Sequence, residues 1–483
     1  MASPIIMKFG GSSVADAARI QGVAEIIASM SAGPRVVVVS AMAGVTDTLV
    51  AITQAIKRHD ASMVHDLLGD IAQLHQTTVG QFKCDPSLKH QLGGTMTQLL
   101  TELRKTVDDV MSEERFSKSN YDRIVSFGER LSIRLVAAAV HHAGVDSVPI
   151  EATELIVTSD RFSDAEPLLD ESTVRTHKRL DQLLKDGKVP IVTGFIGATI
   201  DGHTTTLGRG ASDYTATILG YCLNAREVWI WTDVTGVMTA DPRLIPDART
   251  IDYLSYEEAA ELSYYGAKVL HPLTMVPASL KNIPIWIKNT FDPSATGTQI
   301  WSNAAFGGAV KAISVKKNLA LIRVRGSGIS GVPRIVSRVF NPLAEQQVDV
   351  YLISHASSEQ TISFIVQESE GDKAVSLVRR EFAHEILSHE IDDVHLIDKL
   401  AIVAVVGEGM QGMSGVTGQI FSSLGASGVN VVAIAYGSSE RNISFAVDEA
   451  DADTAIKSLH QTFKLVGKKE SWLTLPKLLK RKQ

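Results

Sequence analysis

A glycine-rich segment from Gly194 to Ala216 combines the residue types that an anion-binding site needs. It reads GFIGATIDGHTTTLGRGASDYTA and follows an apolar run at 189–193 that is typical of a buried parallel strand. Its glycines let the backbone approach a ligand closely, and Arg209 supplies a guanidinium suited to bidentate binding of carboxylate or phosphate. Ser212 or Asp213 would begin the next helix, whose free N–H groups favour anions. The segment therefore predicts chemistry on an anionic substrate.

Two earlier segments also place polar residues directly after apolar strands. Lys8 lies near the end of the first strand and precedes Gly10 and Gly11, so a positive charge and unhindered backbone N–H groups lie close together. A tight turn with a surface lysine would explain the same residues. Thr46 and Asp47 follow the second strand, where hydroxyls suit a crevice at the carboxyl edge of a parallel sheet, or simply an N-cap. Neither segment matches the Walker or GxGxxG pattern.

Three later segments carry charged residues beside glycines or turns. Ser-Phe-Gly-Glu-Arg at 126–130 lies within a helical pattern, where a glycine costs about 1 kcal/mol relative to alanine and so indicates a packing or functional reason. Glu129 would receive a substrate ammonium, or pair with the adjacent arginine or with a neighbouring turn. Arg243 would reach a polyphosphate, or pair with an aspartate in its own turn. Tyr-Gly-Ala-Lys-Val-Leu-His-Pro brings Lys268 near a helix end, and the histidine of this segment, His271, fits a structural hydrogen bond better than a metal or base role.

Length and composition indicate a globular protein of two or three domains. The chain has 483 residues, 45% apolar content and a net charge of −7, which argues against nucleic acid as a partner. No apolar run reaches membrane-spanning length, and no histidine, cysteine or acidic cluster has metal-ligand spacing. Cys84 and Cys222 are the only cysteines, so we expect a reducing compartment, the cytoplasm. The basic tail at 471–483 fits a solvated terminus better than a docking site.

The elements that must position these residues alternate between short strands and longer helices, which predicts an α/β domain with a mainly parallel sheet. The expected strands are Ile5–Phe9, Arg35–Ser40, Ser147–Ile150, Val189–Thr193, Glu227–Thr232 and Ile283–Lys288. A helical insertion is expected at Leu49–Arg58, Ala61–Val79, Leu88–Val110 and Asn120–His142.

The second part of the chain repeats itself. Gly326–Val366 aligns without gaps on Gly407–Val447, and each copy follows the βαββαβ order of a ferredoxin-like unit. Two copies are too few for a solenoid, so we expect a paired module. The predicted division is a first domain at 1–305, repeat domains at 316–392 and 398–470, and the basic tail.

Together these segments resemble the aspartate kinases of the amino-acid-kinase family. The matching blocks occur in family order across residues 4–275, and they are KFGGSSV, VVVSAMAGVTD, SFGER, TGFIGATIDGHTTTLGRGASDYTA, WTDVTGV with DPR, and ELSYYGAKVLHP. The repeats resemble tandem ACT domains, and their amino-acid sequence is closer to that of the threonine-responsive branch. The resemblance implies an α/β/α sandwich followed by two ACT domains. It also implies a monofunctional enzyme, since no segment here resembles the homoserine dehydrogenase of bifunctional relatives.

The activity that the resemblance implies is transfer of the ATP γ-phosphoryl group to the side-chain carboxylate of L-aspartate. The product, 4-phospho-L-aspartate, would lead toward lysine, threonine and methionine. A carboxylate acceptor is already ionised at pH 7, so the site needs no strong general base. It must instead bring two anions together and offset their charge, with Mg²⁺ held mainly by the nucleotide phosphates.

Residue roles follow from motif position within the resemblance. It implies catalytic roles for Lys8, Arg209, Asp213 and Lys268, with Asp213 orienting the catalytic lysine or the substrate amine. It implies aspartate binding by Thr46, Glu129, Arg209, Gly210, Ala211 and Ser212. It implies ATP binding by Lys8, Phe9, Gly10, Gly11, Thr232, Asp233, Met238, Arg243 and Lys268.

The chain departs from the family pattern at four positions. Ala211 replaces a glycine, and Met238 replaces a tyrosine near the nucleotide. His355 and Tyr436 stand where threonine-responsive relatives carry a glutamine that takes part in effector binding. The identity of a feedback ligand, and its existence, are therefore open.

The regulatory prediction concerns the paired repeats. Asp349 and Asn430 occupy equivalent positions at their helix-to-strand turns and differ in charge, so the two effector sites should differ. Asn430 resembles the family's effector-binding residue more closely. We expect threonine as the first candidate effector and lysine as the second, bound where ACT domains pair in a homodimer or larger homo-oligomer.

Two other functions compete with this interpretation. Another amino-acid kinase, acting on glutamate, acetylglutamate, carbamate or UMP, would usually lack both SFGER and the ACT-like repeats. A catalytically dead amino-acid sensor would be expected to lose the charged residues at 8, 129, 209, 213 and 268, all of which are intact. An assay of aspartate-dependent ADP release separates the three.

Overall fold

The computed structural model describes residues 2–30, 33–208, 210–267, 270–302, 308–326, 332–356, 361–437 and 440–465. The chain forms two compact units, and each is described separately. The first unit comprises 1–237, 250–264 and 268–305, and the second comprises 238–249, 265–267 and 306–483. Two short segments of the first 300 residues therefore pack with the repeats.

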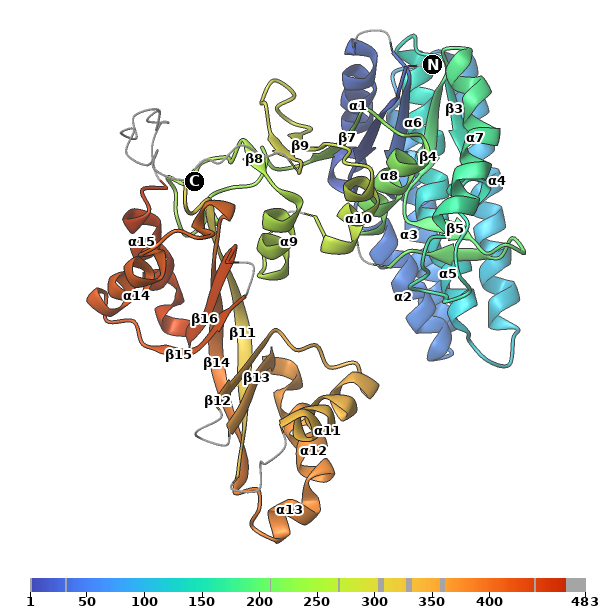
Figure 1. The fold of residues 1–483 in the computed structure, drawn as a ribbon. Coiled ribbons are helices and arrows are strands. Elements are labelled where there is room, and N and C mark those ends of the chain that lie inside the picture. Colours follow the sequence, from blue (N-terminus) through green and yellow to red (C-terminus); the bar gives the residue numbers. More distant parts are fainter. Residues whose placement is uncertain are drawn as a thin grey trace, which may run out of the picture. The chain divides into compact units, whose positions relative to one another are not determined.

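An eight-stranded sheet forms the centre of the first unit, in the order β3-β4-β2-β1-β7-β9-β10-β8 (Figure 1). Neighbouring strands are parallel except for β9 and β10, which confirms the mainly parallel sheet. The strands are β1 (Ile5–Phe9), β2 (Arg35–Val39), β3 (Ser147–Ile150), β4 (Val189–Thr193), β7 (Glu227–Thr232), β8 (Tyr253–Leu254), β9 (Ile285–Asn289) and β10 (Thr298–Ile300). The prediction for β9 began two residues too early, because the apolar run starts in the preceding turn.

Helices cover both faces of this sheet. The first layer contains α1 (Ala17–Ser29) and α6 (Phe127–His142), which contact each other. The second contains α7 (Leu169–Lys185), α8 (Ala211–Cys222) and α10 (Pro272–Leu280). The central strands β1, β2 and β4 are buried on both sides, as the continuous valines of β2 require. The predicted α/β/α sandwich is confirmed. The unit also contains α9 (Tyr256–Tyr264) and the hairpin of β5 (Ile196–Ala198) and β6 (Thr204–Thr206).

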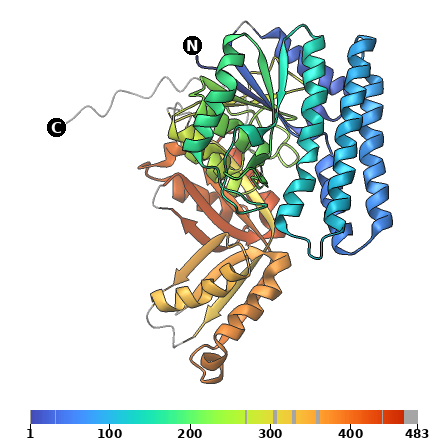
Figure 2. The same ribbon diagram turned by 90° about the vertical axis from the view of Figure 1, so that its right-hand side faces the viewer.

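The helical insertion follows β2. It contains α2 (Val45–Lys57), α3 (Ala61–Gln81), α4 (Pro86–Met111) and α5 (Lys118–Val125), and Figure 2 shows its long blue and cyan helices running side by side. The single helix predicted for 120–142 is wrong, because the chain breaks at Ser126 into α5 and α6. The Ser126 hydroxyl donates to the carbonyl of Arg123, and such back-bonding competes with regular helix hydrogen bonds.

The second unit contains a six-stranded antiparallel sheet in the order β12-β13-β11-β14-β16-β15. Its strands are β11 (Ala312–Arg325), β12 (Leu352–Ala356), β13 (Thr361–Gln367), β14 (Asp393–Val406), β15 (Val431–Tyr436) and β16 (Asn442–Asp448). Its helices are α11 (Val332–Glu345), α12 (Gly371–Glu381), α13 (Ala383–Leu387), α14 (Val416–Ala426) and α15 (Ala452–Thr462). Short 3-10 turns in the described parts of both units span Gly11–Val14, Ala152–Glu154, Glu368–Glu370, Glu408–Met410 and Glu449–Asp451.

Strands β11 and β14 are long enough to serve both repeats. The end of β11 pairs with the start of β14 in the first repeat, and the start of β11 pairs with the end of β14 in the second. Each repeat has its own core with an edge-to-face phenylalanine pair, Phe340–Phe364 at 5.5 Å and Phe421–Phe445 at 5.9 Å between ring centroids. The predicted ferredoxin-like repeats are confirmed. None of the helices in the described ranges combines the length and apolar character needed to cross a bilayer.

Candidate active site

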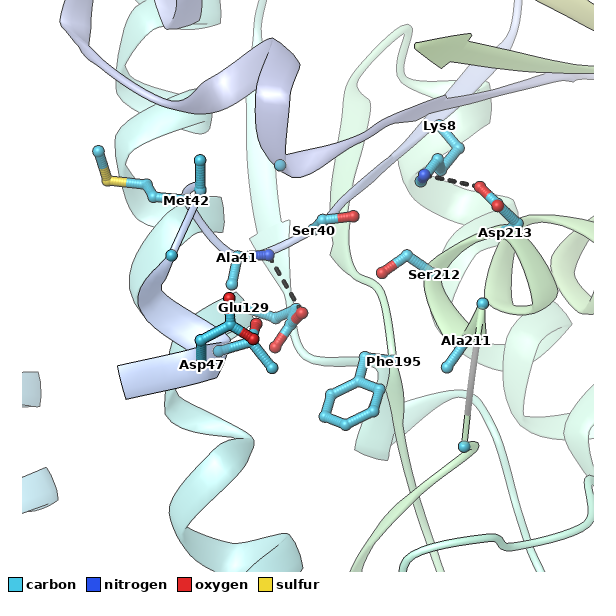
Figure 3. A pocket seen from close by; sticks show the side chains of 16 residues that line it. Lys8, Ser40, Ala41, Met42, Asp47, Glu129, Phe195, Ala211, Ser212 and Asp213 are labelled. Carbon is cyan, nitrogen blue, oxygen red and sulfur yellow. Dashed lines mark hydrogen bonds and ion pairs between the residues drawn. The ribbon is translucent and has the colours of Figure 1, made fainter. Parts of the chain in front are cut away.

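A pocket of about 350 Å³ opens at the carboxyl ends of β1, β2 and β4, within the first unit. This is the edge where parallel α/β sheets bind ligands. Predicted site residues gather here from segments far apart in the sequence (Figure 3). The lining consists of Lys8, Gly11, Ser40, Ala41, Met42, Ala43, Gly44, Thr46, Asp47, Glu129, Phe195, Gly208, Gly210, Ala211, Ser212 and Asp213.

Lys8 and Asp213 form an ion pair on one side of the pocket. The Lys8 Nζ lies 2.6 Å from Oδ1 of Asp213, and the side chains are 11% and 18% exposed. Lys8 is the fourth residue of β1, and Asp213 lies in the first turn of α8. A long, flexible lysine side chain is thereby fixed in one position beside a helix N-terminus, and its remaining hydrogens can face an anion.

Glu129 lies on another side of the pocket, on the first turn of α6. It is 3% exposed, and its Oε1 accepts a hydrogen bond from the backbone N–H of Ala41 at 3.1 Å. Its Oε2 is buried without a hydrogen-bond partner in the described part of the chain. Burial raises the pKa of Glu129 to about 8, and the Ala41 N–H only partly opposes this shift. This carboxylate is suited to a cation that enters the pocket.

Gly128 provides the packing reason that the sequence pattern demanded for this helix. A Cβ at this position would lie 2.8 Å from the Cβ of Ala41, too close for two carbon atoms. Glycine thus allows α6 to approach the loop after β2, and this approach lets Glu129 reach the Ala41 N–H. Because Glu129 bonds to Ala41, the alternative in which it pairs only with the adjacent arginine does not describe this structure.

The first turn of α8 supplies backbone donors at the pocket. The helix begins at Ala211 after Gly210, whose φ of 68° suits glycine, so it starts one residue before Ser212, where the sequence suggested that it could begin. The first helical hydrogen bonds run from Asp213 N and Tyr214 N to the carbonyl of Gly210. The preceding N–H groups, of Ala211 and Ser212, therefore belong to the open helix end that favours anions.

The helix after β2 also starts differently from the sequence expectation. Gly44, with a φ of 82°, precedes α2, and Thr46 and Asp47 lie in its first turn. Neither of them is the N-cap, and both line the pocket. The fold thus presents a second helix N-terminus, with its hydroxyl and carboxylate side chains, to the same cavity.

Comparison with known proteins agrees with this geometry. The amino acid kinase family model matches residues 3–289, and an ACT domain model matches 322–382 and 403–463. Aspartokinase 1 of Arabidopsis thaliana, a chloroplastic protein, is 34% identical over 98% of this chain and 82% of its own length. The chain belongs to the aspartokinases of the amino acid kinase family.

Other aspartokinases support this assignment. The bifunctional aspartokinase/homoserine dehydrogenase of Haemophilus influenzae is 34% identical over 94% of the chain. The chain spans only 56% of that relative, and about half of the similar plant bifunctional proteins. E. coli aspartokinase III in complex with aspartate and ADP has a TM-score of 0.78 and 30% identity, covering 95% of this chain and 99% of that one. The same enzyme in complex with lysine and aspartate has a TM-score of 0.80.

The residues that the aspartokinase resemblance assigns to ATP are only partly brought to the pocket. Lys8 and Gly11 line it, whereas Phe9 is fully buried and stacks on Trp231 with ring centroids 5.7 Å apart. The Gly10 N–H donates to the carbonyl of Trp231, which places the turn after β1 beside the end of β7. Thr232 and Asp233 follow there, and the Thr232 hydroxyl donates to the Asp233 carboxylate at 3.2 Å.

Four further predicted residues lie elsewhere or outside the described ranges. Met238 and Arg243 belong to the second unit, where Arg243 Nε bonds both Asp241 oxygens at 3.0 and 3.1 Å. This pairing raises the pKa of the Arg243 guanidinium. Arg209 and Lys268 lie outside the described residues.

The predicted effector residues lie on the surface of the second unit. Asp349 and Asn430 are exposed and precede the edge strands β12 and β15. Tyr436 ends β15 and is 53% exposed. His355 lies in β12, and its side chain is outside the described part of the structure.

Sequence reasoning missed Phe195 as a pocket residue. Its backbone has a φ of 68°, a left-handed conformation that is rare for a bulky residue. Phe195 N donates to the Thr215 hydroxyl at 3.1 Å, and its carbonyl accepts from Leu207 N at 3.0 Å, so the strained turn is held from both sides. The glycine-rich segment pointed to this region, but a positive φ cannot be read from an aromatic residue.

Proposed function

We propose that this chain is an aspartate kinase that transfers the ATP γ-phosphoryl group to the side-chain carboxylate of L-aspartate. The observation that supports this most is the buried carboxylate of Glu129. One of its oxygens has no hydrogen-bond partner among the described residues, and it lies in the same pocket as the Lys8–Asp213 pair. One group suits a substrate ammonium and the other an anion. E. coli aspartokinase III, which has this fold, was solved with aspartate and ADP.

Charge neutralisation is the main catalytic task in this proposal. Two unit charges 4 Å apart repel by about 4 kcal/mol at an effective dielectric constant of 20. The acceptor carboxylate and the γ-phosphate would meet such repulsion. Lys8 Nζ, held by Asp213, and the N–H groups at the start of α8 would offset it. No side chain has to remove a proton from the acceptor, because it reacts as a carboxylate.

Substrate selection would depend on the two ends of aspartate. Glu129 would bind the ammonium group and Arg209 the α-carboxylate, with Thr46 and Ser212 as neutral donors. The side-chain carboxylate would then point toward Lys8. The pocket volume of about 350 Å³ is in the range for a small ligand.

The nucleotide would bind along the turn after β1 and the end of β7. Gly10, Gly11 and Lys8 would contact phosphate oxygens, with Thr232, Asp233, Phe9, Met238, Arg243 and Lys268 as the other proposed contacts. Within the described residues, no group of three or more histidine, cysteine or acidic side chains could hold a metal. We propose that Mg²⁺ is carried mainly by phosphate oxygens, where it would neutralise part of their charge.

We further propose regulation by an amino acid through the ACT repeats, in a homodimer or larger homo-oligomer. A structure of E. coli aspartokinase III contains lysine, which supports an amino acid ligand for this fold. Threonine remains our first candidate from the sequence of the repeats. The pathway to lysine, threonine and methionine is proposed on the same basis. The free cysteines Cys84 and Cys222 support a cytoplasmic, reducing location.

The test is ADP release by the purified chain with ATP and Mg²⁺, comparing aspartate with glutamate as acceptor. Release that depends on aspartate and is at least tenfold slower with glutamate supports the proposal. Release that glutamate supports better would indicate another amino-acid kinase. A protein that releases no ADP but melts at a higher temperature with threonine or lysine would be a sensor.

A further inference from the structure

Asp122 is a buried carboxylate outside the pocket and outside the predicted site residues. It lies on α5, is fully buried and accepts three hydrogen bonds. Its Oδ2 accepts from Ser163 N at 2.8 Å and from Thr206 N at 3.1 Å, and its Oδ1 accepts from the Thr206 hydroxyl at 2.7 Å. Buried carboxylates are stable only with such partners. Asp122 therefore ties together α5, the loop at 163 and strand β6.

One branch of this network leads through β6 to the wall of the pocket. Thr206 ends β6, and the next residue, Leu207, donates its N–H to the carbonyl of Phe195 at 3.0 Å. Phe195 and Gly208 both line the pocket (Figure 3 shows the Phe195 ring there). The hydrogen bonds to Thr206 thus also hold the neighbouring backbone that carries Phe195 and Gly208 in the pocket wall.

The second branch reaches the same wall through the loop at 163. Ser163 has a φ of 70°, an unfavourable conformation that its hydrogen bond to Asp122 helps to hold. Asp164 follows and packs on Gly208, where an added Cβ would come within 2.7 Å of the Asp164 Oδ1. Both branches therefore meet at Gly208, just before the loop that enters α8.

Asp122 also has a fixed relation to Glu129. It lies seven residues before Glu129, and only Ser126 separates α5 from α6. Two consecutive helices therefore carry Asp122 and the proposed ammonium site, and the hydrogen bonds of Asp122 reach the opposite wall of the pocket.

We propose that Asp122 is a positioning residue for aspartate binding, which sets the distance between Glu129 and the wall formed by Phe195 and Gly208. This inference rests on the proposed function, in which aspartate occupies this pocket. The effect should be confined to aspartate binding, because none of these hydrogen bonds connects Asp122 to the turn after β1, where the nucleotide would bind. Small displacements of binding groups can weaken substrate binding and turnover strongly.

The experiment compares steady-state kinetics of Asp122→Ala and Asp122→Asn with the unchanged chain. Asp122→Ala should raise the KM for aspartate at least tenfold and change the KM for ATP less than twofold. Asp122→Asn should restore the aspartate KM to within about threefold, because the amide oxygen can accept both backbone N–H groups while its NH₂ donates to the Thr206 hydroxyl.

Asp60→Ala is the matched control for a structural effect. Asp60 caps α3 by accepting from Met63 N at 3.0 Å, away from the pocket lining. It should lower the melting temperature without changing either KM. An unchanged aspartate KM in Asp122→Ala, a parallel rise of both KM values, or a failure of Asp122→Asn to rescue would each overturn the inference. Absence of aspartate-dependent ADP release in the unchanged chain would instead refute the proposed function.

Discussion

The candidate active-site pocket and the predicted effector positions differ most in burial. Glu129 is 3% exposed and its partner Ala41 N–H is fixed by close helix packing, whereas Tyr436 is 53% exposed at the end of an edge strand. Asp349 and Asn430 are exposed as well. The pocket is thus assembled within one unit of one chain. The predicted effector positions are open to solvent, and in the proposed regulation a second ACT surface would cover them.

This difference indicates where substitutions act strongly. In the pocket, Glu129 and Lys8 are buried, so water cannot easily compensate for the loss of either charge. At the exposed positions, water can replace a lost contact. Effects on catalysis should therefore exceed effects on regulation, and the predictions below follow that order.

The largest effect is expected for Lys8→Ala. If Lys8 offsets charge that develops during phosphoryl transfer, turnover at saturating ATP and aspartate should fall by about 10²–10³-fold, as for other removed electrostatic contacts. The measurement is kcat from ADP release. Lys188→Ala is the control, because Lys188 forms an exposed pair with Asp146. An unaltered kcat with only a raised KM for ATP would remove Lys8 from the catalytic residues.

The next effect is expected for Glu129→Gln. Loss of the carboxylate should raise the KM for aspartate by about 10–100-fold, corresponding to a charge-assisted hydrogen bond of about 1.5–3 kcal/mol, and leave the KM for ATP unchanged. Glu113→Gln is the control, since Glu113 forms an exposed pair with Arg123. Equal changes in both KM values would contradict a specific ammonium contact.

The raised pKa of Glu129 also predicts how aspartate use depends on pH. With a pKa of about 8 in the empty pocket, Glu129 becomes protonated as the pH falls below 8 and can no longer attract an ammonium. The kcat/KM for aspartate should therefore fall from pH 8 to pH 6, by up to about tenfold per pH unit. The amide introduced by Glu129→Gln does not titrate, so the profile of that variant should be flatter. Parallel profiles for the two proteins would assign the pH dependence to another group.

Glu129 should also destabilise the empty protein at high pH. Its pKa in the folded state lies above the ordinary value of 4.5, so its contribution to stability is present below pH 4.5 and is lost as the pH rises through 8. Glu129→Gln should accordingly raise the melting temperature at pH 8 relative to the unchanged chain, and the gain should shrink at pH 5. The measurement is thermal unfolding without ligands. A gain that does not depend on pH would show that this carboxylate is not the cause.

The sequence predicted those parts of the fold that local patterns determine. Each strand that was expected from a β-branched run is present in the sheet, and the internal repeat located both ferredoxin-like modules. Helix boundaries were less predictable, because Gly44 and Gly210 cap their helices through positive φ rather than through side-chain hydrogen bonds. The break at Ser126, whose hydroxyl donates to the carbonyl of Arg123, is not revealed by the helical periodicity.

The candidate site was predictable in composition and less so in contacts. Lys8, Glu129 and Asp213 line one pocket, and the Lys8–Asp213 pair agrees with the implied role of Asp213 in orienting a lysine. The motifs did not reveal that Glu129 keeps an oxygen unpartnered by any described residue. Such facts depend on packing between elements that are far apart in the sequence. The domain boundaries and the individual residue roles stay predictions until they are tested by substitution.

The smallest effect is expected at the turns before the edge strands. Asp349 and Asn430 are equivalent in the two repeats, so exchanging their charge tests whether the two effector sites differ. Asn430→Asp should weaken inhibition by threonine, and Asp349→Asn should change it less, because Asn430 resembles the family's effector-binding residue. Coupling energies between sites are typically about 1–3 kcal/mol, so the change in half-inhibitory concentration should be a few-fold.

Inhibition titrations with threonine, with lysine and with both, at pH 6 and pH 8, provide the measurement. A ligand inhibits only if it binds one state of the enzyme better than another, so its binding should also shift the melting temperature. Inhibition that is weaker at one pH than at the other would agree with a contribution from His355, whose ordinary pKa lies between these values. If the two substitutions have equal effects, the repeats bind effector equivalently. If neither amino acid changes activity or melting temperature at millimolar concentration, the repeats serve assembly, and Asp349 and Asn430 bind no effector.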